Sequence, residues 1–94
     1  MSVRWRPAPR SEFAAAIQYL NARNTGAAKQ LRDDIYAAIQ RLEERPRLGR
    51  PSNFPGCRAW SLVKWRKIIV YRVEDDGLEI VRLLDAGMQP PDDL

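Results

Sequence analysis

The sequence predicts an α+β fold of the order β-α-α-β-β-β, in which a helical hairpin packs on a small antiparallel sheet. Three observations predict it. The first half of the chain carries apolar residues at helical spacing in two segments that only a few residues separate. The second half changes to the two-residue alternation of strands. Between the halves, residues 46–56 are rich in proline and glycine, as is typical of a rigid loop.

The chain opens with a short strand and a first helix. Val3 and Trp5 alternate with arginines up to Pro7, which predicts a strand over residues 2–6. Apolar residues then recur at spacings of four and three, so we expect a helix that begins at Pro9 or Ser11 and ends near residue 22. The residues of this apolar face are Phe13, Ile17 and Leu20.

A second, longer helix follows after a break at residues 24–26. Either Asn24 or Thr25 can cap it, since both side chains accept hydrogen bonds from the first helical turn. It should end at Glu44 or Arg45, because Pro46 disfavours helical geometry in the residue before it. The short connection forces the helices into an antiparallel hairpin, whose apolar faces need a third surface. The stripe of this helix consists of Ala28, Leu31, Ile35, Ala38, Ile39 and Leu42.

Three strands supply that surface. Residues 58–63, 67–73 and 78–84 alternate in the manner of strands, and KIIVYRV at 67–73 is the strongest of the three. Turns at 64–65 and 75–77 make the pairing antiparallel. The helices cover one face of this sheet, so the opposite face must be polar or be covered by something else. Residues 90–94 read as a frayed acidic tail.

Length and cysteine content bound the class of protein. With 94 residues, the chain has room for one hydrophobic core, so we expect a single domain over residues 1–94. Cys57 is the only cysteine, which excludes an intrachain disulfide and favours a reducing, cytoplasmic location. The first ten residues lack an apolar signal-peptide core, and no apolar run approaches the roughly 20 residues that cross a bilayer. We therefore expect neither export nor a membrane partner.

The formal charge of +4 is unevenly distributed. The stretch from 45 to 72 holds eight cations and no acidic residue, and such a block favours an anionic partner. It can be a solvated basic face, or it can dock on nucleic acid or an acidic protein surface. The eight cations are Arg45, Arg47, Arg50, Arg58, Lys64, Arg66, Lys67 and Arg72.

Few kinds of catalysis fit this composition. The chain has no histidine and a single cysteine, so nucleophile–histidine pairs and a zinc site are excluded, and we expect no metal or cofactor. Arginines and lysines with a tyrosine can still stabilise charge on an RNA phosphate without a metal. Arg72 and Arg82 would have to reach the same face of the sheet to act together. The candidates are Arg58, Arg66, Lys67, Tyr71, Arg72 and Arg82.

The three tryptophans have two possible roles. Trp5 and Trp60 lie on short strands, where packing is a better explanation than stacking on bases. Trp65 stands between two cations at a turn, so it is the best candidate for exposure on a binding surface.

Several segments, in this order, resemble the ParE branch of the ParE/RelE toxin superfamily of bacterial type II toxin–antitoxin systems. They are VRWRPAP, FAAAIQYL, AAKQLRDDIYAAIQRLEERPRLGRP, GCRAW and IIVYRVEDDGLEIVRLLDAGM, and they cover nearly the whole chain. The resemblance implies the fold above and a toxin that serves plasmid or chromosomal stability. It further implies neutralisation by a ParD-like antitoxin, whose C-terminal helix and extended segment wrap the toxin. That antitoxin can itself bind operator DNA, so a hetero-oligomer is expected.

The resemblance also separates two activities, because ParE-type members inhibit DNA gyrase, whereas RelE-type members cut messenger RNA on the ribosome. RNA-cleaving relatives carry an arginine just before the apolar VY segment of the third strand, and the nearest positions of this chain are Ile68 and Lys67 or Arg66. Their last strand ends in a histidine and an arginine, where this chain has Asp85 and Gly87. An acid is unfavourable where an RNA phosphate would lie. These departures favour binding over catalysis.

Three hypotheses follow. The leading one is a non-catalytic toxin that binds DNA gyrase. The alternatives are a ribosome-dependent, metal-independent endoribonuclease that uses Arg58, Arg66, Lys67, Arg72 and Arg82, and a non-toxic module that binds the antitoxin within a repressor complex. In each case the surface for target or antitoxin is predicted to comprise Arg58, Trp60, Trp65, Arg66, Lys67, Arg72, Arg82 and Met88.

Overall fold

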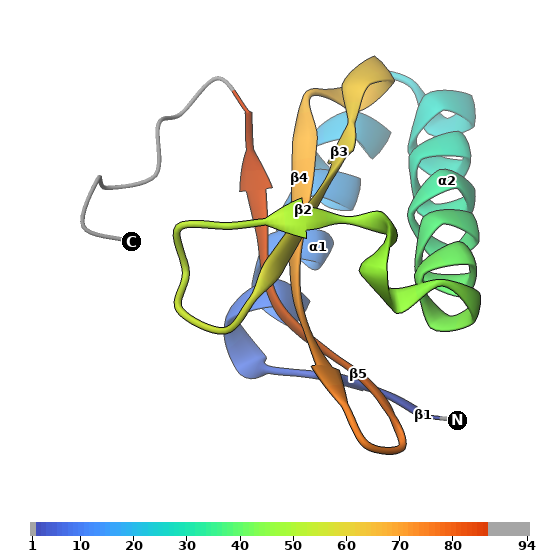
Figure 1. Cartoon of the computed structure of the whole chain (residues 1–94). Coiled ribbons are helices and arrows are strands. Elements are labelled where there is room, and N and C mark those ends of the chain that lie inside the picture. The colour runs from blue at the N-terminus through green and yellow to red at the C-terminus, as the bar shows by residue number, and fades with distance from the viewer. Residues whose placement is uncertain (1, 87–94) are drawn as a thin grey trace.

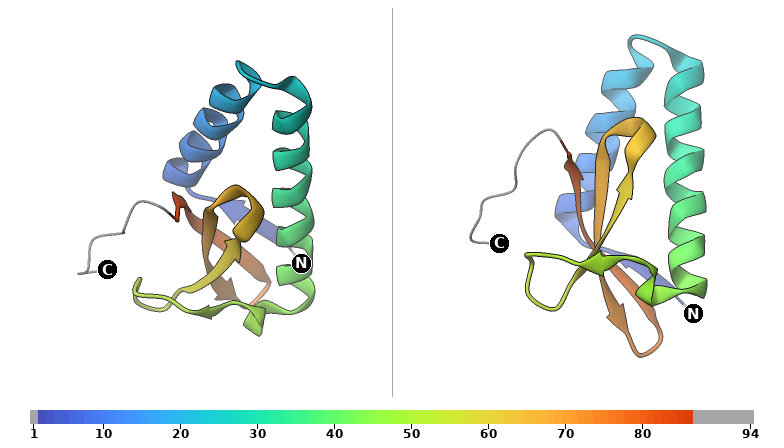
Figure 2. Two further views of the ribbon diagram at one scale, coloured as in Figure 1. Left: turned by 90° about the horizontal axis from the view of Figure 1, so that it is seen from above. Right: turned by 45° about the horizontal axis from the view of Figure 1, so that its top comes forward.

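A five-stranded sheet in the order β1-β5-β4-β3-β2 carries both helices on one side (Figures 1 and 2). This is a computed structural model, and it describes residues 2–86. The strands are β1 Ser2–Trp5, β2 Arg50–Pro51, β3 Arg58–Leu62, β4 Lys67–Glu74 and β5 Gly77–Asp85. The helices are α1 Pro7–Asn21 and α2 Thr25–Glu44, with short 3-10 turns η1 Pro46–Leu48 and η2 Val63–Trp65. The predicted α+β fold class is confirmed.

The first helix begins earlier than expected. Pro7 occupies its first turn, where the missing N–H is not needed, and Arg6 before it is extended at φ −71° and ψ 164°. The predicted start at Pro9 or Ser11 was therefore too late, because Pro7 suits the first helical turn equally well. Of the two possible caps of α2, Asn24 is the one used, because its Oδ1 accepts a hydrogen bond from the Ala27 N–H at 2.9 Å.

Strand β1 is the exception to antiparallel pairing. It lies parallel to β5, with Ser2 opposite Gly77 and Trp5 opposite Ile80. The three other pairs of neighbouring strands are antiparallel, as predicted for β3–β4 and β4–β5. Strand β2 was not predicted, because it lies in the segment read as a rigid loop. The turns of the sequence fix the direction of only the strands that they join, whereas the rest of the chain separates β1 from β5 and leaves the direction free.

The main core fills the space between the helices and the sheet. Leu31, Ile35 and Leu42 of α2 are at most 2% exposed, and Ile69 and Ile80 meet them from β4 and β5. Trp5, Trp60 and Trp65 all pack against this core, each from a different element. The predicted packing of Trp5 and Trp60 on the core is confirmed, and each side chain stays partly exposed.

The opposite face of the sheet holds a smaller apolar cluster. Cys57, Val70 and Val81 are buried there, with Phe54, Ile68 and Leu84 partly buried around them. The turn at 52–57 covers this cluster, held by the Ser52 Oγ, which donates to the Cys57 carbonyl at 3.0 Å. We expected that nothing in this chain could cover the face of the sheet opposite the helices. That expectation is wrong around Val70 and Val81, because part of the proline- and glycine-rich loop at 46–56 folds back over these strands.

Candidate functional site

The basic side chains of β4 and β5 are held by carboxylates. Lys67 lies opposite Asp85 in the strand register, and the two form an ion pair. Arg82 pairs with Glu12 of α1, to which its Nε donates at 2.9 Å, and this hydrogen bond raises the pKa of Arg82. The other oxygen of Glu12 accepts the Leu83 N–H at 2.8 Å. Two of the predicted phosphate-binding cations are thus already neutralised.

Arg72 is engaged in the same way. Its Nη1 lies 3.8 Å from the Glu79 carboxylate, which also accepts a hydrogen bond from Arg6 at 3.0 Å. The Arg6 hydrogen bond, followed by the positive charges of its neighbours, lowers the pKa of Glu79. The β-bulge between Val70 and Tyr71 leaves Arg82 opposite Val70, so the register places Arg82 on the same face of the sheet as Val70 and Arg72. The two arginines still do not form a free pair, because each is held by a different carboxylate.

Tyr71, the proposed proton-transfer partner, is fully buried. Its hydroxyl donates to the Pro46 carbonyl at 2.6 Å and accepts from the Gly49 N–H at 2.9 Å. Burial raises the pKa of this hydroxyl. A phenol enclosed in this way is a structural support of the 46–49 loop and does not reach an RNA substrate, so the prediction of Tyr71 as a site residue is wrong.

Arg58 and Arg66 differ from these cations, because neither forms an ion pair within residues 2–86. Arg66 is exposed after η2 with a left-handed backbone at φ 55°. Arg58 is half-buried, and its Nη1 donates to the Gly49 carbonyl at 2.7 Å. The guanidinium of Arg58 keeps further donors, since it carries five N–H groups.

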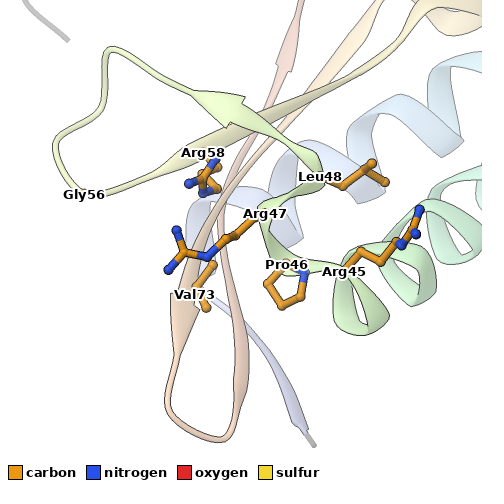
Figure 3. A pocket seen from close by; sticks show the side chains of 7 residues that line it. All are labelled: Arg45, Pro46, Arg47, Leu48, Gly56, Arg58 and Val73. Carbon is orange, nitrogen blue, oxygen red and sulfur yellow. The ribbon is translucent and has the colours of Figure 1, made fainter.

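A pocket of about 560 Å³ opens beside Arg58, at the C-terminal end of α2 (Figure 3). Two further arginines line it, Arg45 and Arg47, which the sequence identified as part of the basic block without marking them as site residues. The sequence signal was the run RPRL at 45–48, because a proline ends the helix there and leaves the two arginines beside it in a turn. The remaining lining residues are Pro46, Leu48, Gly56 and Val73.

The two tryptophans of the predicted surface are both half-buried. Trp60 packs on the core, with the Arg41 guanidinium 5.6 Å from its ring centre. Trp65 is not the exposed residue that its flanking charges suggested, because η2 turns it back onto α2, where its Nε1 donates to Asp34 at 2.8 Å. Met88, Gly87 and the acidic tail at 90–94 lie outside the described residues.

Residues 2–86 contain no group of three acidic, cysteine or histidine side chains that could hold a metal ion. None of the helices described is long and apolar enough to cross a membrane.

Comparison with known families assigns the chain. The family model described as the ParE toxin of the type II toxin–antitoxin system, parDE, matches residues 3–90. The chain belongs to the ParE toxin family. This confirms the ParE resemblance of the sequence segments, and the match runs from β1 past the end of β5.

Among solved structures, this ParE-family chain is similar to one from the chromosomal ParDE TA system of P. aeruginosa. The TM-score is 0.79 at 24% sequence identity, over 90% of this chain and 95% of the other. At this identity the likeness shows the shared fold of two helices on a sheet. None of the curated proteins has a significant sequence match to the chain.

Proposed function

We propose that this ParE toxin-family chain inhibits DNA gyrase by binding it, and that a ParD-like antitoxin neutralises it in a cytoplasmic hetero-oligomer. Family membership supports an antitoxin partner. Binding, as opposed to catalysis, is supported by the state of the cations, since Lys67, Arg72 and Arg82 each face a carboxylate. A catalytic cation must be free to stabilise charge that develops on the substrate. The surface of Arg58, Arg66, Trp60 and Trp65 with Met88 is proposed to contact target or antitoxin.

The test is a supercoiling assay with purified gyrase and relaxed plasmid. We expect the chain to reduce supercoiling in a dose-dependent manner, and an equimolar ParD-like antitoxin, taken from the adjacent reading frame, to restore it. The control is the same assay with a type I topoisomerase, which should be unaffected.

Two results would contradict the proposal. Unchanged gyrase activity together with new, codon-linked 5′ ends in cellular transcripts would establish the endoribonuclease instead. Unchanged gyrase activity and intact RNA, with the antitoxin still bound, would establish the non-toxic module.

A further inference from the structure

The pocket at the end of α2 has the features of a carboxylate-binding site. We propose that it binds an acidic segment with aliphatic neighbours from a partner polypeptide, in which Arg47 and Arg58 hold the carboxylate. That this polypeptide is the antitoxin rests on the proposed function. The chemistry of the pocket does not depend on it.

The charges of the pocket are uncompensated within the described chain. Arg45, Arg47 and Arg58 line it, no acidic residue does, and none of the three forms an ion pair within residues 2–86. Figure 3 shows the Arg47 and Arg58 side chains on the same side of the pocket near Val73, whereas Arg45 extends away over α2. Guanidinium groups are weakly hydrated and match a carboxylate with two parallel N–H donors. Arg47 and Arg58 are therefore the pair that an anion would meet.

The wall that carries these arginines is preorganised. The buried Tyr71 hydroxyl fixes the loop at both Pro46 and Gly49, and Arg58 is fixed to the Gly49 carbonyl. A Cβ on Gly49 would lie 2.4 Å from the Tyr71 hydroxyl, so the loop and the tyrosine are in close contact. A site that is ordered before binding loses less entropy when its ligand arrives.

The rest of the lining is apolar. Pro46 and Leu48 are half-buried, and Val73, opposite Leu78 near the turn of the β4–β5 hairpin, is 43% exposed. An exposed β-branched side chain beside free arginines suits a ligand with an aliphatic group next to its charge. This combination is offered by a leucine or valine that neighbours an aspartate or glutamate in a peptide.

The surroundings favour a peptide over a nucleic acid. Among the described residues, no aromatic side chain lines the pocket, so they offer no platform on which a base could stack. The strand that carries Val73 ends at Glu74, which pairs with Arg4, and exposed Asp75 and Asp76 form the next turn. The two aspartates would repel a run of phosphates, whereas a single carboxylate avoids them. The paired state of Lys67, Arg72 and Arg82 also removes the cations that could extend a phosphate track.

The test is an NMR titration of the isotope-labelled full chain with two probes of equal charge. One is a capped hexapeptide of alternating leucine and glutamate, and the other is an oligothymidylate with three phosphates. We expect the peptide to shift the backbone amides of residues 45–49, 58 and 73, and R47A to weaken its binding about tenfold or more, the effect of losing one charged hydrogen-bonding partner. Arg47 is exposed, so this variant should fold, which circular dichroism checks.

Matched variants separate local contacts from net charge. Arg32→Ala removes the same charge from an exposed position on α2 and should leave the peptide affinity within about twofold. Arg47→Lys keeps the charge without the two-pronged donor, so its affinity should fall between those of the wild type and Arg47→Ala.

Each other outcome overturns the inference. Shifts at the pocket that are stronger with the oligothymidylate would assign it to nucleic acid, and no shift with either probe would show that it is no ligand site. Equal weakening by Arg32→Ala would reduce the effect to net charge. Failure of the proposed function is seen separately: gyrase unaffected by the wild type would refute that function, while the peptide titration would still decide the pocket.

Discussion

Tyr71 shows how one buried hydroxyl supports a functional loop. Tyr71→Phe removes the partner of both the Pro46 carbonyl and the Gly49 N–H, so we expect a loss of about 1–3 kcal/mol in the free energy of unfolding. Urea denaturation at neutral pH measures it. Tyr36→Phe is the matched control, because Tyr36 is 50% exposed and should change stability by less than about 0.5 kcal/mol.

The same tyrosine should make stability depend on alkaline pH. Because burial raises the pKa of Tyr71 above its ordinary value of 10.0, the folded state holds the proton more tightly than the unfolded state. This contribution to stability is complete below the unfolded pKa and is lost as the pH rises through the folded pKa. The wild type should therefore lose more stability than Tyr71→Phe above about pH 10. Parallel profiles for the two proteins would contradict the role of burial.

Glu79 should give the opposite dependence in acid. Its pKa is lowered chiefly by the hydrogen bond from Arg6, so its contribution to stability is present above its ordinary value of 4.5 and is lost as the pH falls through the depressed folded pKa. Carboxyl NMR should show the Glu79 titration moving upward in Arg6→Ala. An unchanged titration in that variant would show that Arg6 is not the cause.

At the scale of elements, the junction of β1 with β5 depends on a glycine. Gly77 has φ +155°, and a Cβ there would lie 1.7 Å from the Ser2 carbonyl oxygen. Gly77→Ala should therefore displace β1 and cost about 1–3 kcal/mol, measured by urea denaturation. Gly26→Ala in α2 is the control, since its Cβ meets only an ordinary contact at 3.4 Å and should change stability by less than about 1 kcal/mol. Equal effects of the two changes would contradict a close approach at Gly77.

The local spacing of apolar residues predicted the helices and strands that carry a regular pattern. It did not predict contacts between segments that are distant in the sequence. The stripe of α2 and the alternation of β4 are each readable within one segment, and both agree with the structure. The Glu12–Arg82 pair joins residues 70 positions apart, and no local pattern marks it. Trp65 was misread for the same reason, because its neighbours in sequence are charged while its partner Asp34 lies on another element. Periodicity therefore positions candidate residues on elements but does not tell which of them are already paired.

At the scale of the whole molecule, folding divides one basic block into two kinds of surface. Carboxylates of β5 neutralise Lys67 and Arg72 of this block, and Glu12 of α1 neutralises Arg82 beyond it, while η1 and β3 gather the free arginines of the pocket. Net charge alone would have predicted a uniformly attractive face. Within residues 2–86, the fold instead brings three unpaired arginines of the block together at one end of α2, apart from Arg66 at η2, which is why we place the partner's acidic segment there.

The helical hairpin and the sheet should also unfold as one unit. Trp5, Trp60 and Trp65 come from β1, β3 and η2, and all three pack on the core that α2 shares with β4 and β5. Tryptophan fluorescence therefore reports the joint between the layers, and far-UV circular dichroism reports the helices. The two urea transitions should coincide, with a slope of roughly 1–3 kcal/mol per molar urea.

Ile35→Val should lower both midpoints equally, because Ile35 is fully buried at that joint. Helical signal lost at lower urea than fluorescence would instead show that the hairpin is a separate folding unit, and would contradict a single domain over residues 1–94.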